Sequence, residues 1–334
     1  MIPKIIEIKN RDPEMLTLTW VINNICNNSC SYCPDELHSG TNHDYTWENA
    51  RRFIELLFQR YTRIHCAIAG GEPTMSPHLL EMCRMFREHD NIVGFTTNGV
   101  ANKRRYQELA KLCNYICISF HPATQPESSF DEFIDKAREI GEHCWCHISV
   151  MTPSSNFDHS VKFYNYLREH PGKYSAELVR ITSWGVPDNY DHIYSESQLI
   201  ELDRLNSLKI DNNIRNRDDK SIDDHDPLQF GKDIDPKFDK SESAVIDFFG
   251  TNLFTVNDLI SRNMTYFQGW ECNIGLESLF VRQGRIKRGN CSVGDFIGHI
   301  DDLDNIQWPE SSIICDQSRI CHCPSDVRIT KRML

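Results

Sequence analysis

In the first half of the chain, hydrophobic positions recur every second residue in some stretches and every third or fourth residue in others. The first spacing is typical of strands and the second of helices. Strands are predicted at Leu16–Ile22, Ile64–Ala69, Ile92–Thr97, Tyr115–Phe120, Trp145–Met151 and Ala176–Ile181. Helices are predicted between them at Ala50–Tyr61, from Ser76 and Pro77 onward, and at Arg104–Leu112, Phe130–Ile140 and Ser160–Arg168.

This alternation of strands and helices predicts an α/β fold, in which a parallel sheet has helices outside it. Right-handed crossovers allow such a sheet to curl into part of a barrel. The six predicted units are fewer than the eight of a closed (β/α)8 barrel. Thr46 is suited to begin the first helix, because its hydroxyl can accept a backbone N–H of the first turn.

The second half of the chain is less regular. A helix is expected around Leu199–Leu208, and further structure at Ala244–Phe249 and Val256–Met264. Between them, residues 211–243 are acidic, polar and poorly periodic, as in a long surface loop or a mobile segment. The run Asp223–Asp226 could bind a metal or form a solvated run of charge.

Near the carboxyl terminus, Leu279–Arg282 and Arg285–Lys287 predict two strands joined by a tight turn. The chain is therefore expected to have three parts. These are a partial barrel over residues 1–195, a helical and acidic linker region over 196–265, and a small domain with a β-hairpin over 266–334.

Composition narrows the class of protein. No apolar run approaches the roughly 20 residues of a membrane span, and the first 12 residues lack a long apolar core, so we expect no membrane insertion and a cytoplasmic location. A net charge of -12 argues against nucleic-acid binding, and favours either cationic substrates or solubility alone. Fourteen cysteines in such a chain indicate metal ligation or buried thiols. Those expected in the core are Cys66, Cys83, Cys113, Cys117, Cys144 and Cys146.

Three cysteines, Cys26, Cys30 and Cys33, lie close together just after the first predicted strand. Thiolates spaced in this way suit an iron–sulfur cube, because each sulfur can bind a different iron. Three protein ligands leave the fourth iron open, which is the mark of a reactive rather than a structural metal site. The alternatives are a zinc knuckle or three core cysteines, although zinc prefers four ligands in separated pairs.

With Tyr32 just before the last cysteine, this stretch resembles the cluster loop of the radical S-adenosylmethionine (radical SAM) superfamily. The resemblance implies a 4Fe–4S cluster whose open iron is chelated by the amino and carboxylate groups of S-adenosyl-L-methionine (SAM). It also implies that Tyr32 lies beside the adenine of SAM. The expected fold is an open, partial (β/α)6 barrel of the TIM type.

In parallel α/β barrels, chemistry gathers at the carboxyl ends of the strands. Gly70, Gly71 and Glu72 follow the second predicted strand, and glycine lets the backbone approach a ligand closely. This segment is similar to the Gly-Gly-Glu segment of radical SAM enzymes, which implies contact with the methionine amino group; alone it would be a plain turn. Thr97 and Asn98, after the third strand, resemble residues that lie beside the cofactor in that family.

Ser119 and His121 come at the end of the fourth predicted strand. The resemblance implies that Ser119 lies near the SAM ribose, whereas His121 stands where many relatives have an aspartate. His121 could bond the ribose or the substrate, or be an ordinary loop histidine. Residues after the last two strands that could line a substrate pocket are Thr152, Arg180, Thr182 and Trp184. Arg180 could equally be half of a surface ion pair.

Five further cysteines lie near the carboxyl terminus. Cys272, Cys291, Cys321 and Cys323 could hold a second cluster completely, since a hairpin brings the first two together. The arrangement is similar to the twitch domain, the shortened form of the SPASM domain of radical SAM enzymes. Cys315 is an alternate ligand, a buried thiol, or a hydrogen-atom donor to a substrate radical. Structural zinc is the alternative to a second cluster.

The resemblance implies an enzyme that receives an electron from a flavodoxin or ferredoxin, cleaves SAM to a 5′-deoxyadenosyl radical, and abstracts a hydrogen atom. Most relatives with twitch or SPASM domains crosslink, oxidise or epimerise peptides, so a ribosomally synthesised peptide is the expected substrate. Only 25 residues precede Cys26, so a separate leader-peptide-binding protein is expected. The alternatives are dehydrogenation or epimerisation of a sugar or aminoglycoside and, outside enzymes, an electron carrier or a zinc-stabilised binding module.

Overall fold

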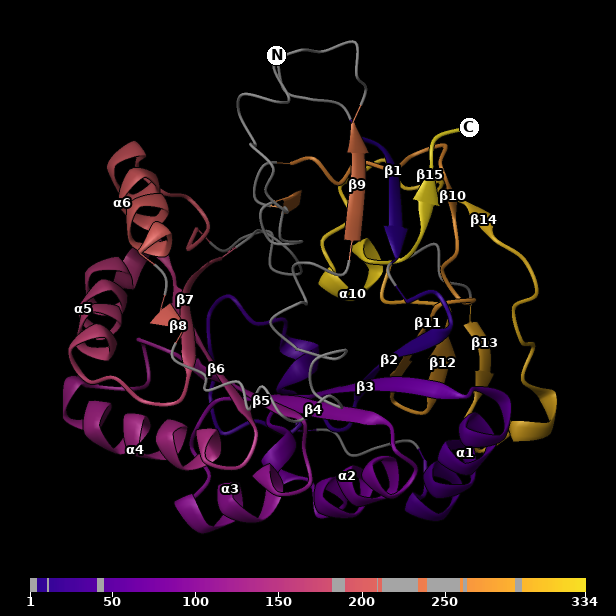
Figure 1. Ribbon diagram of the computed structural model, residues 1–334, viewed down its shortest axis with the longest axis horizontal. Helices are drawn as coiled ribbons and strands as arrows, with labels where there is room; N and C mark the ends of the chain where they lie inside the picture. Colours follow the sequence, from indigo (N-terminus) through magenta and orange to yellow (C-terminus); the bar gives the residue numbers. More distant parts are fainter. Residues whose placement is uncertain are drawn as a thin grey trace, which may run out of the picture. The chain divides into compact units, whose positions relative to one another are not determined.

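The protein is described from a computed structural model (Figure 1). The described residues are 5–10, 12–40, 45–181, 190–208, 210–211, 234–238, 259–260, 263–291 and 296–334. The predictions for Thr182, Trp184, Asp223–Asp226 and Ala244–Phe249 lie outside them, as does most of Val256–Met264.

The chain forms two compact units, each assembled from separate stretches of sequence. Unit 1 combines Met1–Trp20, Asp44–Cys66 and Lys220–Leu334, and unit 2 combines Val21–His43 and Ala67–Asp219. The functional division expected at residues 195 and 265 stays a prediction, because these units reflect compactness alone.

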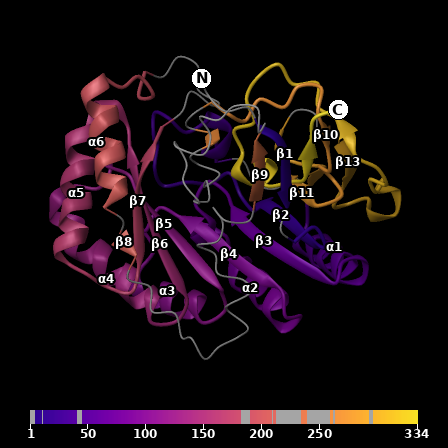
Figure 2. The same ribbon diagram turned by 45° about the horizontal axis from the view of Figure 1, so that its top comes forward.

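Unit 2 contains a sheet whose strands β4 to β7 run parallel and side by side in chain order. Their bounds are β4 Ile92–Thr97, β5 Tyr115–Phe120, β6 Trp145–Thr152 and β7 Ser175–Arg180, and the antiparallel β8, Ile210–Asp211, follows β7. The connecting helices are α2 Leu79–Glu88, α3 Lys103–Ala110, α4 Phe130–Gly141, α5 Phe157–Glu169 and α6 Glu196–Ser207. Helices α2 to α5 lie along the outer face of these strands (Figures 1 and 2). The protein therefore has an α/β fold with a parallel sheet, as predicted.

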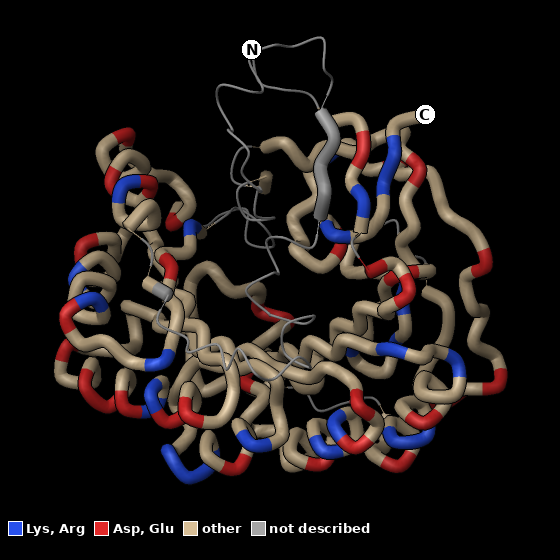
Figure 3. The backbone as a smooth tube through the Cα atoms, in the orientation of Figure 1, with Lys and Arg blue, Asp and Glu red and all other residues tan. Residues whose placement is uncertain are grey.

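The sequence explains these elements locally. Helix α2 buries Leu79, Met82, Cys83 and Phe86, which recur at helical spacing on one face. Strand β5 is buried along almost all of its length, as expected of a strand in a covered parallel sheet. Charges of both signs lie on the outer helices (Figure 3). No closed barrel is present among the described strands.

Three further predicted elements are present: β2 Met15–Val21, α1 Trp47–Arg60 and β3 Arg63–Ala69. The hydroxyl of Thr46 accepts the Asn49 N–H at 3.2 Å, so the predicted helix cap is confirmed. The predicted hairpin is also present, as β11 Ser278–Arg282 and β12 Arg285–Lys287, and β13 Phe296–His299 pairs with β12.

A second sheet in unit 1 has the strand order β14-β10-β15-β1-β9. Its strands are β1 Ile5–Asn10, β9 Ile234–Phe238, β10 Glu271–Cys272, β14 Ile313–Ile314 and β15 Lys331–Arg332. Strand β1 was not expected, and the prediction of a loop over 211–243 is wrong at β9, because pairing with β1 makes that stretch a strand.

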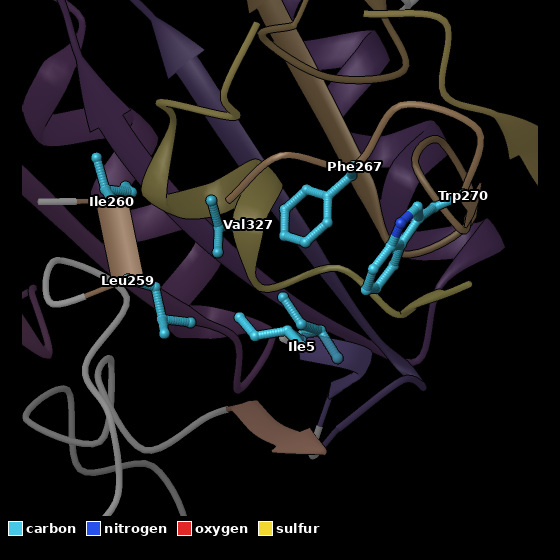
Figure 4. Close-up of a cluster of buried hydrophobic side chains, with 7 residues drawn as sticks. Ile5, Leu259, Ile260, Phe267, Trp270 and Val327 are labelled. Atoms are coloured by element: carbon cyan, nitrogen blue, oxygen red, sulfur yellow. The ribbon is translucent and has the colours of Figure 1, made fainter. Parts of the chain in front are cut away.

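One hydrophobic cluster of unit 1 gathers residues from distant parts of the chain (Figure 4). Its buried members are Ile5, Ile8, Leu259, Ile260, Phe267, Trp270 and Val327. Val327 belongs to the short helix α10, Pro324–Val327. The 3-10 helices are η1 Asp35–Leu37, η2 Pro73–Met75, η3 Glu127–Ser129, η4 Ser154–Asn156 and η6 Leu303–Asn305. Within the described ranges, no helix has the length and apolar character needed to cross a membrane.

Candidate functional site

The Gly-Gly-Glu segment is hydrogen-bonded to the chain that leads into the cysteine loop. The N–H of Gly71 donates to the backbone oxygen of Asn23 at 2.9 Å, and the N–H of Glu72 donates to that of Ile25 at 2.7 Å. A Cβ atom on Gly71 would lie 2.4 Å from the Ile25 oxygen and 2.5 Å from the Leu37 oxygen. Only glycine therefore fits here, because the two backbones touch. The structure brings two of the predicted motifs together.

The carboxylate of Glu72 is buried, with 1% of the residue exposed. Its Oε1 accepts hydrogen bonds from the Thr74 N–H at 2.9 Å, the Thr74 hydroxyl at 2.5 Å and the Thr97 hydroxyl at 2.7 Å. Its Oε2 accepts the Asn98 N–H at 2.7 Å. Four donors offset the cost of burying this charge. Glu72 thus links the segment after β3 to the end of β4.

The predicted residues after β4 reach the cysteine loop. The Asn98 side chain donates through Nδ2 to Asn27 Oδ1 at 2.8 Å and lies 3.8 Å from Cys26 Sγ. Thr97 Oγ1 also lies 2.9 Å from the Tyr106 hydroxyl, within the core. Gly99 follows with φ of 76°, a left-handed turn that suits glycine. The loop around Cys26 is therefore held on one side by the residue that follows β4.

The three thiols of the loop influence one another. Cys30 has 7% of its surface exposed, and Cys26 and Cys33 are partly buried. Burial raises the pKa of Cys30, a hydrogen bond with Tyr32 lowers it, and the charge of Cys26 raises it again. Burial raises the pKa of Cys33 to about 12, and Cys30 and Cys26 add to the effect. Three crowded thiols resist ionising together unless cations join them, and iron would supply those cations.

The residues of this loop fit an iron–sulfur cluster. Among the described residues, no group of three or more His, Cys, Asp or Glu side chains is arranged to hold a metal ion. A four-iron cube does not need such convergence, because each cysteine binds its own iron. The Nδ2 atom of Asn28 is buried and has no hydrogen-bond partner. A buried donor without an acceptor could bond to a sulfide ion of the implied cluster or to a carboxylate oxygen of SAM.

His121 lies against the cysteine loop. Its Nδ1 is 2.8 Å from the Tyr32 hydroxyl and 3.4 Å from Cys30 Sγ. The rings of Tyr32 and His121 stack at an angle of 11° with centroids 6.1 Å apart. Burial lowers the pKa of His121 to about 4, so the imidazole is neutral near pH 7. His121 is therefore part of the site, although its role in ribose or substrate binding stays a prediction.

Two other predicted residues lie on neighbouring strands. Ser119 is buried near the end of β5, and its contact with a ribose stays a prediction. Arg180 is exposed at the end of β7, and its guanidinium carbon lies 5.3 Å from the ring centroid of Tyr194. The Tyr194 hydroxyl donates to the Thr152 backbone oxygen at 2.6 Å and accepts the Ile181 N–H at 2.8 Å. Tyr194 thus joins the ends of β6 and β7 beneath Arg180.

Two residues that no sequence pattern indicated hold the site together. The Asp191 carboxylate accepts the Ser31 hydroxyl at 2.5 Å and also the hydroxyl of Ser155. Asp191 therefore ties the cysteine loop to the segment after β6. Gln125 accepts the His121 N–H at 2.6 Å and donates to the Asn98 backbone oxygen at 2.9 Å. Neither residue belongs to a periodic element or a motif that would have marked it.

The carboxyl-terminal thiols all belong to unit 1. Cys272 on β10 is buried and lies across from Lys331 on β15. The N–H of Cys291 donates to Asp326 Oδ2 at 2.7 Å, while Cys323 forms the N-cap of α10. The backbone N–H of Cys315 donates to the backbone oxygen of Trp270 at 2.8 Å, and the backbone N–H of Cys321 donates to that of Thr265 at 2.7 Å. Each of the five thiols thus sits on a backbone segment held by hydrogen bonds or strand pairing.

A buried cation lies among these segments. Lys331 is 3% exposed, and its Nζ donates to the backbone oxygens of Asp326, Ile329 at 3.0 Å and Val327 at 3.4 Å. No ion pair of Lys331 occurs within the described part of the chain. Burial raises the pKa of Cys321, and Lys331 opposes that rise. A buried ammonium group of this kind favours an anionic neighbour. Between Cys321 and Cys323, the Nδ1 atom of His322 is also buried and has no hydrogen-bond partner.

The comparisons with solved structures give a likeness of fold. Three crystal structures of SuiB from Streptococcus suis are similar to this chain. SuiB alone has a TM-score of 0.50, at 14% identity, over 88% of this chain and 66% of SuiB. SuiB bound to S-adenosylmethionine has a TM-score of 0.49, at 15% identity, over 87% of this chain and 66% of SuiB. SuiB bound to the precursor peptide SuiA has a TM-score of 0.49, at 14% identity, over 88% of this chain and 65% of SuiB.

The chain thus spans 65% to 66% of the length of SuiB. A comparison with curated proteins gives no match. The family comparison is decisive, because the model of the radical SAM superfamily matches residues 20–193, which include the cysteine loop, the Gly-Gly-Glu segment and strands β4 to β7. This chain belongs to the radical SAM superfamily.

Proposed function

We propose that this protein is a radical SAM enzyme that cleaves SAM reductively and abstracts a hydrogen atom from its substrate. The observation that carries the proposal is the contact between the cysteine loop and the ends of the strands. Gly71 and Glu72 bond to the backbone just before Cys26, and Asn98 reaches the Cys26 sulfur. A structural zinc knuckle would not require this convergence of loop and glycine-rich segment.

In this proposal Cys26, Cys30 and Cys33 hold the first cluster, and SAM binds its open iron. Bound together, cluster and SAM supply the electron and the radical precursor for the reaction. The remaining work falls to the chain. Glu72 holds the ends of the strands at a fixed spacing, and the Tyr32 ring would lie beside the adenine of SAM. Gly70, Gly71, Thr97, Asn98 and Ser119 would complete the SAM site.

We further propose that unit 1 carries an auxiliary 4Fe–4S cluster on Cys272, Cys291, Cys321 and Cys323, with Cys315 as alternate ligand. The buried Lys331 supports this assignment, because four thiolates around a cluster would place negative charge near a buried cation. The resemblance to twitch and SPASM domains supports it as well. Functionally, the barrel would extend over residues 1–195 and the auxiliary domain over 266–334.

For the substrate we propose a ribosomally synthesised peptide, with a flavodoxin or ferredoxin as reductant and a separate protein as leader-peptide binder. This choice rests on the resemblance of the carboxyl-terminal cysteines to those of peptide-modifying enzymes. The net charge of -12 favours the second candidate, an aminoglycoside or other cationic sugar.

Anaerobic reconstitution with iron and sulfide, followed by dithionite and SAM, tests the reaction class. An enzyme of this kind forms 5′-deoxyadenosine and methionine. An electron carrier would bind iron without cleaving SAM, and a zinc module would assemble no cluster. The substrate is then tested with candidate peptides encoded next to the gene and with aminoglycosides, by mass loss or by deuterium transfer into 5′-deoxyadenosine.

A further inference from the structure

One nitrogen of His121 lies within reach of two groups in the cysteine loop. Nδ1 is 2.8 Å from the Tyr32 hydroxyl and 3.4 Å from the Cys30 sulfur. A sulfur acceptor is larger than an oxygen, so 3.4 Å between N and S is a full hydrogen-bond distance. The imidazole thus touches both the aromatic residue of the loop and one of its proposed cluster ligands.

The neighbourhood holds the imidazole in place. The preceding residue, Phe120, is fully buried and stacks on Phe163 with ring centroids 3.9 Å apart. The backbone N–H of His121 is bonded to Gln125, whose amide is bonded in turn to the Asn98 backbone. The ring itself stacks on Tyr32. His121 is therefore anchored on both sides, as expected of a residue that orients a ligand.

The protonation state of Cys30 determines whether His121 Nδ1 can donate a hydrogen bond to it. A neutral imidazole carries one N–H, on either ring nitrogen. A cysteine bound to iron is a thiolate, which can only accept. The tautomer with its hydrogen on Nδ1 can donate to that sulfur, which also forms a hydrogen bond with the Tyr32 hydroxyl.

We propose that His121 is a positioning residue that donates Nδ1–H to the Cys30 sulfur and thereby eases reduction of the SAM-binding cluster. This rests on the proposed function, in which Cys30 is a cluster ligand. Hydrogen bonds to the sulfurs stabilise the extra negative charge of the reduced cluster, so they raise its reduction potential. No bond is made or broken by His121.

The competing explanation is that His121 serves only to orient Tyr32. Three variants separate the two roles. His121→Phe keeps a ring to stack on Tyr32 but has no nitrogen. His121→Asn keeps an N–H close to the position of Nδ1. Tyr32→Phe removes the hydroxyl that shares Nδ1 and that also forms a hydrogen bond with Cys30, so it measures the contribution of that second bond.

The experiment is a redox titration of the reconstituted full-length chain, followed by the EPR signal that changes when SAM is added. In H121F the cluster should be about tenfold harder to reduce, which corresponds to about 59 mV for a one-electron couple. H121N should recover most of this loss, whereas Y32F loses the separate hydrogen bond between the Tyr32 hydroxyl and Cys30 and should also be harder to reduce than the wild type. Equal potentials in H121F and the wild type, or in H121F and H121N, would overturn the inference.

A second measurement uses the wild-type protein, so it does not depend on whether a variant folds. In wild-type protein labelled with nitrogen-15 histidine, pulsed EPR of the reduced cluster should show a weak coupling to one histidine nitrogen. Absence of that coupling would also overturn the inference. A wild-type protein that assembles no SAM-sensitive cluster at all would instead contradict the proposed function, so the two failures can be told apart.

Discussion

The Glu72 carboxylate accepts a hydrogen bond from the Thr97 hydroxyl at 2.7 Å, deep in the core where the segment after β3 meets the end of β4. The same carboxylate binds three further donors, from Thr74 and Asn98. Glu72 therefore serves the scaffold with its side chain, and the contact expected with SAM would fall to the backbone of its segment.

We predict that Glu72→Gln weakens both fold and site. Gln would turn an amide N–H2 toward donors that now meet a carboxylate, at a cost of about 1–3 kcal/mol in the free energy of unfolding. Urea unfolding of the reconstituted protein measures this cost. Glu88→Gln, on the exposed end of α2, is the control and should be close to neutral. Equal stability of the two variants would contradict the scaffold role.

Gly71→Ala should be more disruptive than its size suggests. The added methyl group would overlap two carbonyl oxygens of the segment around the cysteine loop, at 2.4 and 2.5 Å. We expect a loss of about 1–3 kcal/mol in unfolding free energy and a lower iron content after reconstitution. Gly40→Ala is the comparison, since it has a positive φ of 71° but nothing within 4 Å of the new Cβ. If G40A loses as much iron as G71A, the overlap with the two carbonyl oxygens does not explain the loss in G71A.

Asp191→Ala should loosen the cysteine loop without unfolding the sheet. The change leaves the hydroxyls of Ser31 and Ser155 without their shared acceptor. Because Ser31 lies between two proposed ligands, we expect roughly tenfold weaker SAM binding, equivalent to the loss of about 1.4 kcal/mol. Titration of SAM against the cluster's EPR signal measures it. Ser155→Ala removes only the other half of the clamp and should have a smaller effect.

Lys331→Met should destabilise the protein both before and after iron is added. Burial raises the pKa of Asp326 and Lys331 opposes that rise, so removing the ammonium group leaves a buried carboxyl group without its cation and weakens the iron-free protein. In the reconstituted protein, the same change removes the cation that faces the proposed thiolate ligands, so iron content and thermal stability should fall. Lys331→Arg keeps the charge and should retain more iron than K331M. An auxiliary cluster that loads fully in K331M would contradict this role.

The sequence predicted the parallel sheet well, since β4 and β5 have the bounds that their hydrophobic pattern indicates. Strands buried on both faces carry their own signal in composition. Strands β1 and β9 do not, because each becomes a strand only by pairing with a partner more than 200 residues away, as Ile8 does with Pro236.

The site divides in the same way. The spacing of Cys26, Cys30 and Cys33 and the pair Gly70-Gly71 are local patterns, so they could be found without a structure. Asp191 could not, because its bond to Ser31 spans 160 positions and neither residue belongs to a motif. His121 was named as a departure from the family pattern, but its contact with Cys30 depends on how the loop folds back over the end of β5.

The central claim is that Cys26, Cys30 and Cys33 hold a cluster whose fourth iron binds SAM. The most direct test is the EPR spectrum of the dithionite-reduced, reconstituted protein before and after SAM is added, in the wild type, Cys30→Ala and Cys83→Ala. Cys83, a buried thiol on α2, is the control. We predict that SAM changes the spectrum of the wild type and C83A, and that C30A lacks this signal. A wild-type spectrum that SAM leaves unchanged, or a SAM-sensitive signal that persists in C30A, would contradict the account.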